Sequence, residues 1–192
     1  AVYLYNSVID GLQIDLFQSN KSLYEKEEWV TSDYGLPSIK LATPEALTRV
    51  GNTTDKAENL QKNNANFIYA NLKTGLSISL NTTAINTDEN TKIEDLYAQK
   101  IKLMEQTLGA KNIKSDKETF NQDGFEGIRG SGTFITSNPV TNKEQTVQFE
   151  TYIFIQKDGV QEVTIFYNEN DEYGAKIARR VIESIQLSVN NE

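Results

Sequence analysis

Residues 127–132, which read GIRGSG, are the part of the chain whose residue types most resemble a nucleotide-binding or catalytic motif. A dinucleotide-binding loop needs a third glycine after Gly130 and Gly132, and a nucleophile elbow needs glycines two positions before and after Ser131; both requirements fail. No Gly-Lys-Ser/Thr follows, so a P-loop is excluded. Glycines within a strand more often mark a bulge, a strong twist or a closely packed helix, and we expect that role here.

Carboxylates are the other side chains that could do chemistry. Four of them lie at or before the start of a predicted helix: Asp88, Glu89, Glu94 and Asp95. The calcium-loop spacing D-x-[DN]-x-[DN]-G is absent, and acidic residues at such a place normally interact with the helix dipole. Two carboxylates could hydrolyse a glycoside without His or Cys, but no pair stands out among the 27 acidic residues. We therefore predict no catalytic residue, no cofactor, no metal ligand and no enzymatic activity.

The composition disfavours several further classes of protein. The 192 residues contain neither Cys nor His, which removes thiolate nucleophiles and the usual zinc ligand sets. A net charge of -8 disfavours nucleic-acid binding, because the chain repels phosphate. No apolar run approaches the roughly 20 residues of a membrane helix, so we predict no transmembrane segment. Because the sequence begins with Ala1 and not Met, we expect an extracytoplasmic place, in the periplasm or cell envelope, if a leader was removed, and a cytoplasmic one otherwise.

The C-terminal third of the chain predicts the elements that must position any site. Residues 147–155 alternate between two faces that both carry apolar side chains, which is typical of a strand inside a sheet. Asp158 and Gly159 favour a tight turn, and residues 160–167 return as a second, antiparallel strand. Apolar residues then recur at helical spacing over 177–185. A helix with one apolar stripe needs a sheet face to bury it, so we predict a helix packed on an antiparallel sheet.

Earlier parts of the chain show weaker versions of the same patterns. Further predicted elements are a hairpin over 67–80 turned at Gly75, a helix over 93–108 closed by Gly109, and strands over 112–122 and 124–136. Residues 3–16 predict an N-terminal hairpin around Asp10-Gly11. Trp29 is either a core or cover residue or a residue that stacks on a ligand. A strand near residue 39 ends at Pro44, which also fits the first position of a short helix.

The chain resembles the PsbP-like family, whose fold is shared with the yeast Ran-binding nuclear import factor, over residues 36–188. The resemblance rests on LPSIKLATPEAL, FIYANLKTGLSISL, KIEDLYAQKIKLMEQTLG, FEGIRGSGTF, FETYIFIQKDGVQEVTIFY and the closing VIESIQL. It implies an α+β fold: an α/β/α sandwich with a central, mainly antiparallel sheet and flanking helices at about 93–108 and 173–186. One compact unit would then consist of an N-terminal hairpin extension over 1–35 and a PsbP-like domain over 36–192.

The resemblance also implies an accessory or assembly role through protein contacts. We therefore expect a non-catalytic interaction domain of the cell envelope, a monomer or weak dimer, whose partner is another protein. Such a domain needs an exposed apolar or aromatic patch, for which Tyr3, Tyr5 and Tyr34 are candidates. An alternative is a small-ligand-binding protein with a cavity between sheet and helix. A hydrolase with two carboxylates is a third hypothesis.

Overall fold

The computed structural model describes residues 19–35, 37–50, 64–83, 91–138, 140–157 and 159–188. Their main element is a seven-stranded sheet in which every pair of neighbouring strands is antiparallel. In spatial order the strands are β3 (Thr48–Val50), β4 (Asn64–Asn71), β5 (Leu76–Thr83), β9 (Gly159–Asn168), β8 (Glu144–Gln156), β7 (Phe125–Ser137) and β6 (Lys111–Gln122). The strand predicted to lie inside the sheet, β8, does so between β7 and β9.

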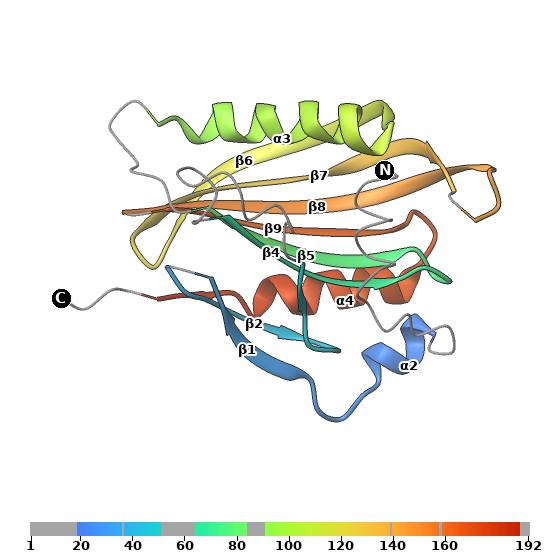
Figure 1. The fold of residues 1–192 in the computed structure, drawn as a ribbon, viewed down its shortest axis with the longest axis horizontal. Helices are drawn as coiled ribbons and strands as arrows, with labels where there is room; N and C mark the ends of the chain where they lie inside the picture. Colours follow the sequence, from blue (N-terminus) through green and yellow to red (C-terminus); the bar gives the residue numbers. More distant parts are fainter. Residues whose placement is uncertain are drawn as a thin grey trace, which may run out of the picture.

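Two layers flank this sheet. Helix α3 (Ile93–Leu108) lies on one side, and α4 (Glu172–Glu183) lies on the other with a small three-stranded sheet (Figure 1). The small sheet has the order β1 (Val30–Tyr34), β2 (Ile39–Thr43), β10 (Gln186–Leu187), and the short helix α2 (Asn20–Tyr24) packs against α4. The predicted α/β/α sandwich with a mainly antiparallel sheet is therefore confirmed.

Helix α3 forms where its apolar spacing predicts. Glu94 and Asp95 lie in its first turn, where the positive end of the helix dipole stabilises them. The helix ends at Gly109, whose φ of 59° is the left-handed conformation that favours glycine. Its buried residues Ile93, Tyr97 and Met104 pack on β7 and β8.

Helix α4 connects the main sheet to the small one. The Asp171 side chain caps it by accepting a hydrogen bond from the Gly174 amide at 2.8 Å. Ile177, Ala178 and Val181 of α4 are fully buried in the larger core, between β9 and β2. At its C-terminal end the Ser184 hydroxyl accepts a hydrogen bond from the Ala42 amide of β2 at 2.8 Å. Ser184, which belongs to the closing VIESIQL segment of the family resemblance, therefore joins the end of α4 to the small sheet.

The glycines of β7 have the packing role that the sequence predicts. A Cβ on Gly130 would lie 2.2 Å from the Tyr97 hydroxyl oxygen, so this glycine lets α3 approach the sheet. A Cβ on Gly132 would lie 1.9 Å from the Lys114 carbonyl oxygen, beside a register shift in β6. Both positions need glycine because of close approach, as expected for a bulge and a closely packed helix.

Three local expectations are wrong. No helix begins at Pro44: the Leu47 amide donates to the Tyr34 hydroxyl at 3.1 Å, and the chain continues into β3. Tyr34 is consequently 7% exposed and belongs to the core, so it is no part of an exposed patch. The predicted turn residue Gly159 already belongs to β9, paired with Gln156.

Other expectations concern residues for which no structure is described. The N-terminal hairpin over 3–16, with Tyr3 and Tyr5, lies outside the described residues, as do Asp88 and Glu89. Residues 20–34 form α2 and β1, which pack on α4 and β2. The division of the chain at residue 35 stays a prediction.

Candidate functional site

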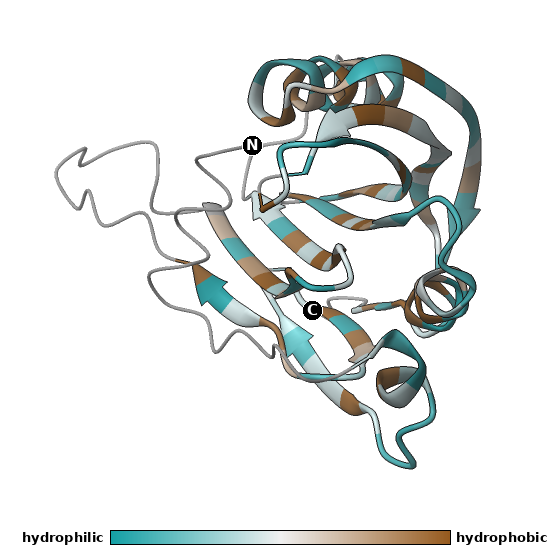
Figure 2. Ribbon diagram, turned by 90° about the vertical axis from the view of Figure 1, so that its right-hand side faces the viewer, coloured by the Kyte–Doolittle hydropathy of each residue, from teal (hydrophilic) through white to brown (hydrophobic). Residues whose placement is uncertain are grey.

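The two flanking layers cover different parts of the main sheet. Helix α3 packs on β7 and β8, whereas α4 packs against β9 on the opposite face. In the described part of the chain, no helix lies over β4 and β5 on the α3 side (Figures 1 and 2). A groove therefore forms between α3 and these strands, and we call it the α3 groove.

The α3 groove contains a cavity of about 160 Å³. Its walls are mainly apolar and come from α3, β4, β7, β8 and β9: Ile68, Ala70, Leu103, Met104, Leu108, Phe134, Val147 and Phe166. Phe134 and Phe166 meet edge to face, with ring centroids 5.7 Å apart. These walls define an apolar site.

Leu103 marks the mouth of the groove. Its side chain is 51% exposed and lies at the edge of the apolar stripe of α3, next in sequence to the buried Met104. Since α3 is displaced toward β7 and β8, Leu103 extends beyond the part of the helix that the sheet covers. An exposed leucine beside an apolar cavity enlarges the continuous apolar surface available to a partner.

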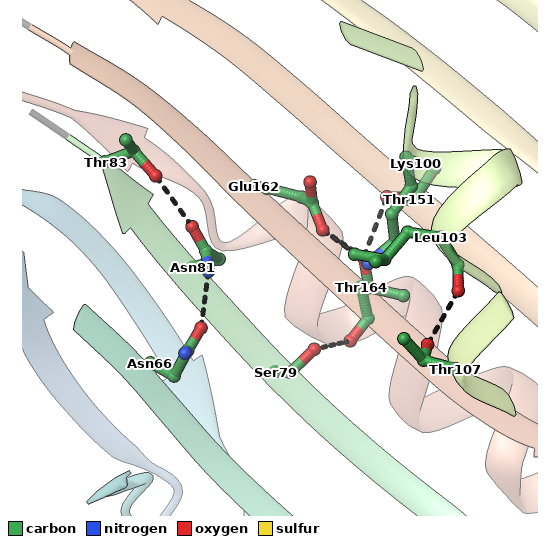
Figure 3. Close-up of polar contacts among 10 residues, drawn as sticks. All are labelled: Asn66, Ser79, Asn81, Thr83, Lys100, Leu103, Thr107, Thr151, Glu162 and Thr164. Atoms are coloured by element: carbon green, nitrogen blue, oxygen red, sulfur yellow. Dashed lines mark hydrogen bonds and ion pairs between the residues drawn. The ribbon is translucent and has the colours of Figure 1, made fainter. Parts of the chain in front are cut away.

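One end of the groove is polar (Figure 3). Lys100 of α3 forms an ion pair with Glu162 of β9, and their side chains are only 12% and 23% exposed. On the sheet beneath them, the hydroxyls of Thr151 and Thr164 share a hydrogen bond of 2.8 Å, and Ser79 donates to the Thr164 carbonyl oxygen at 3.3 Å. The strands thus present hydroxyls where the helix presents an ammonium group.

A second polar group extends this surface along β4 and β5. Asn81 donates to the Asn66 side-chain oxygen at 2.5 Å, and Thr83 donates to the Asn81 side-chain oxygen at 3.0 Å (Figure 3). These side chains stand on the uncovered α3 side of the sheet, because Leu80 between Asn81 and Ser79 belongs to the core on the other side. The open part of the sheet is therefore lined with amides and hydroxyls beyond the apolar cavity.

On the opposite face, no described helix covers a region over β6, β7 and β8, which we call the charged hollow. It encloses about 330 Å³ and is lined by Asp116, Lys117, Glu118, Arg129, Gly130, Ser131, Glu150 and Tyr152. It lies on the α4 side, since Tyr152 packs beside Phe154 of the larger core. Arg129 forms an exposed ion pair with Glu118.

Glu150 is the carboxyl of the charged hollow whose pKa is shifted by its surroundings. Burial raises its pKa, while a hydrogen bond from the Tyr167 hydroxyl at 3.3 Å opposes the shift. Burial, and then the neighbouring Glu150 carboxylate, raises the pKa of the Tyr167 hydroxyl. The two groups lie at the inner edge of the hollow, between the sheet and the side of α4 that carries Arg179.

The described residues do not bring together the acidic side chains that the sequence analysis considered. Glu94 and Asp95 remain in the first turn of α3, and the described residues contain no group of acidic side chains arranged to hold a metal ion. Trp29 is a cover residue: it packs on the larger core, and the Arg180 guanidinium carbon lies 3.9 Å from the ring centroid.

Lys100 and Leu103 were not singled out by sequence reasoning. A signal for them exists in α3, because Lys100 interrupts the apolar stripe between Tyr97 and Met104, at spacings of three and four. Leu103 extends the same stripe sideways, so that it is wider than packing on two strands requires. A charged residue inside a stripe and an extra leucine at its edge together indicate a helix that is only partly covered.

Comparison with known proteins identifies the fold. No protein-family model and no curated protein sequence matches the chain. Among solved structures, cyanobacterial PsbP (CyanoP) from Synechocystis is similar with a TM-score of 0.52 and 12% identity, over 85% of this chain and 96% of that one. The chain thus has the PsbP-like fold.

Two further solved structures show weaker similarity. The Ran-binding protein Mog1p of Saccharomyces cerevisiae matches with a TM-score of 0.48 and 11% identity, over 83% of this chain and 96% of that one. LpqN of Mycobacterium tuberculosis, which is involved in cell envelope biogenesis, matches with a TM-score of 0.44 and 13% identity, over 91% and 99%. None of the described helices has the length and apolar composition to span a bilayer.

Proposed function

We propose that the protein is a non-catalytic accessory domain that acts by binding another protein, and that the α3 groove is its binding site. The observation that carries this proposal is the apolar cavity beside the half-exposed Leu103. Partly exposed apolar surface of this kind is a common feature of protein interaction sites. A partner would bury Leu103 and place an apolar side chain between α3, β4 and β5.

The size of the cavity favours a partner side chain over a free ligand. Pockets for drug-sized molecules enclose roughly 300–1,000 Å³, whereas this cavity encloses about 160 Å³. An apolar cavity of about 150 Å³ holds a single benzene ring. One aromatic or aliphatic side chain therefore fills the site, and a single buried side chain is the usual centre of a protein interface.

A small-ligand-binding protein is the second candidate, because the cavity lies between sheet and helix as that function requires. Native mass spectrometry of the purified protein separates the two. A retained small molecule, lost when the cavity is filled by Ala70→Phe, would favour the second candidate.

The proposed compartment is the cell envelope. A chain without cysteine has no thiol to be oxidised there, which supports this placement. Fractionation of native cells, followed by immunodetection of the protein, tests it directly. Recovery with cytoplasmic markers would contradict the proposal.

Site-specific photo-crosslinking tests the binding site. A photoreactive phenylalanine analogue replaces Leu103 in cells that make the protein naturally, and a control carries it at Val140, which is 70% exposed on the loop after β7. We expect one protein adduct from position 103 and none from position 140. The adduct should disappear when Ala70→Phe is added, because the added ring occupies the cavity.

The filled variant must remain folded for this comparison to hold. Trp29 is the only tryptophan and lies against α4, so its fluorescence reports folding without reporting the groove. Equal adducts from both positions, or an adduct that persists in folded Ala70→Phe protein, would contradict the proposed site.

A further inference from the structure

Among the described residues, one charged side chain lines the cavity of the α3 groove, and it is a cation. Lys100 lines the cavity together with apolar side chains, hydroxyls and amides, and none of the described lining residues is a carboxylate. Glu162, the ion-pair partner of Lys100, lies outside the lining. The cavity is therefore complementary to an occupant that is apolar and carries a negative group.

The ammonium group of Lys100 has capacity for a second acceptor. An ammonium group donates three hydrogen bonds, and Glu162 Oε1 is its acceptor among the described residues. Its side chain is 12% exposed, so a carboxylate that reached it would be held in a partly desolvated place. Charge-assisted hydrogen bonds are about twice as strong as neutral ones.

Strand β5, opposite Lys100, offers a further donor. Ser77 lines the same cavity and its hydroxyl faces the α3 side, whereas the Ser79 hydroxyl already donates to the Thr164 carbonyl oxygen. A carboxylate accepts hydrogen bonds only, so an ammonium group and a hydroxyl suit it better than they suit a cation. The groove thus combines an apolar cavity with an ammonium group and a hydroxyl that can donate.

We propose, on the basis of the protein-binding function above, that the partner's anchor is an apolar side chain with a carboxylate beside it. The apolar side chain fills the cavity between Met104 and Phe166, and the carboxylate binds Lys100 in competition with Glu162. A C-terminal aromatic or aliphatic residue has this chemistry, since its α-carboxylate lies one bond from the carbon that bears the side chain.

The overall charge of -8 opposes this preference at long range and does not remove it. Exposed charges more than about 8 Å apart are largely screened at physiological salt, while partly buried pairs are screened much less. The carboxylate preference must therefore arise at contact with Lys100 and should persist at physiological ionic strength.

Two minimal probes test the proposal on the full chain. N-acetyl-phenylalanine carries the carboxylate, and N-acetyl-phenylalanine amide has the same side chain without the charge. Met104 is the only methionine, is 2% exposed and lines the cavity, so a labelled methionine methyl group gives one NMR signal that reports occupancy. We expect both probes to shift this signal, with the acid binding about tenfold more tightly than the amide.

Three variants locate the origin of the preference. In Lys100→Gln the acid and the amide should bind equally. In Glu162→Gln, which removes the competing carboxylate, the preference for the acid should increase. Lys102→Gln is the matched control, because Lys102 lies on the exposed side of α3 and outside the cavity lining; its preference should equal that of the unchanged protein.

Loss of one member of a half-buried ion pair can destabilise the fold. The double variant Lys100→Gln with Glu162→Gln removes both charges and should behave as Lys100→Gln does. If neither probe moves the Met104 signal, the groove does not bind an apolar anchor and the proposed function fails with this inference. If both probes bind equally to the unchanged protein, or if Lys102→Gln loses the preference as Lys100→Gln does, only the carboxylate preference is overturned.

Discussion

In the described part of the chain, the α3 groove and the charged hollow are both regions of the main sheet that no helix covers, yet their surfaces differ. The groove exposes Leu103 beside an apolar cavity, whereas the hollow presents Asp116, Glu118 and Arg129. Charged side chains are well solvated and cost little when uncovered, while exposed apolar surface loses the free energy that burial would give, about 25 cal/mol per Å². Covering the groove would therefore gain more free energy than covering the hollow, so the groove is the region where we expect a partner to bind.

The difference has a simple structural cause. Helix α3 packs on β7 and β8, and α4 packs on β9 and β2 from the other side, so each layer leaves the opposite half of a sheet face uncovered. On the α4 side the uncovered strands are β6 to β8, whose exposed residues are mostly polar. On the α3 side they are β4 and β5, whose apolar Ile68 and Ala70 line the cavity.

The largest expected effect follows from truncating a wall of the groove. Phe134 is 3% exposed and packs against Phe149 and Phe166, so Phe134→Ala should lower the free energy of unfolding by about 3–5 kcal/mol. Ser131→Ala in the exposed charged hollow should change it by less than about 0.5 kcal/mol. Chemical denaturation measures both. Similar losses in the two variants would show that the hollow is packed as tightly as the groove.

A smaller, pH-dependent effect belongs to the charged hollow. Because burial raises the pKa of Glu150 above the ordinary value of 4.5, the folded protein binds this proton more tightly than the unfolded chain. The stability that the folded protein gains by binding this proton is fully present below the pKa of Glu150 in the unfolded chain. It is lost as the pH rises through the pKa of Glu150 in the folded protein. Glu150→Gln should therefore be more stable than the unchanged protein near neutral pH, and this gain should vanish in acid.

Denaturation at about pH 7 and at about pH 3.5 tests this sign, since the two values lie on either side of the reference Glu pKa of about 4.3. Glu118→Gln is the exposed control and should change the free energy of unfolding by less than about 0.5 kcal/mol at both. A loss of stability in Glu150→Gln at neutral pH would mean that the ionised carboxylate stabilises the hollow.

The smallest effect on stability is expected at Leu103. Leucine and glutamine have similar helix propensities, and the side chain is half exposed, so Leu103→Gln should change the free energy of unfolding by less than about 0.5 kcal/mol. Binding of N-acetyl-phenylalanine to the groove should nevertheless weaken, as titration of the Met104 signal would show. A loss of stability comparable to that of Phe134→Ala would make Leu103 a core residue and remove the contrast between the two regions.

Most of the fold could be predicted because its helices, strands and turns each have a pattern within a few neighbouring residues. The stripe of α3, its closing Gly109, the turn at Gly75 and the two-sided apolar pattern of β8 are each contained in a few neighbouring residues. The short helix α2 could not be predicted, since five residues are too few to show a helical period. The Ser19 side chain caps this helix, and its Leu23 is buried against α4.

The site could not be predicted for a different reason. A stripe on α3 says which side of the helix faces the sheet, and it does not say which strands the helix covers. The groove depends on that lateral position, and so do the exposure of Leu103 and the pairing of Lys100 with Glu162, 62 residues later in the chain. Lys100 and Leu103 in the stripe indicate a helix that is only partly covered, but the strands it covers and the partner of Lys100 are set by tertiary packing, which the local sequence does not show.

The hydrogen bond from the Ala42 amide to the Ser184 hydroxyl joins residues 142 positions apart in the sequence. Strand β10 pairs with β2 across a similar interval. The hairpins β6–β7–β8–β9, by contrast, connect strands that follow one another in the chain. Because closing a long loop costs more entropy than closing a short one, the meander should assemble early and the small sheet late. On the ribosome, β2 must wait until α4 and β10 have been made, so the beginning of this domain becomes native only when its end has been synthesised.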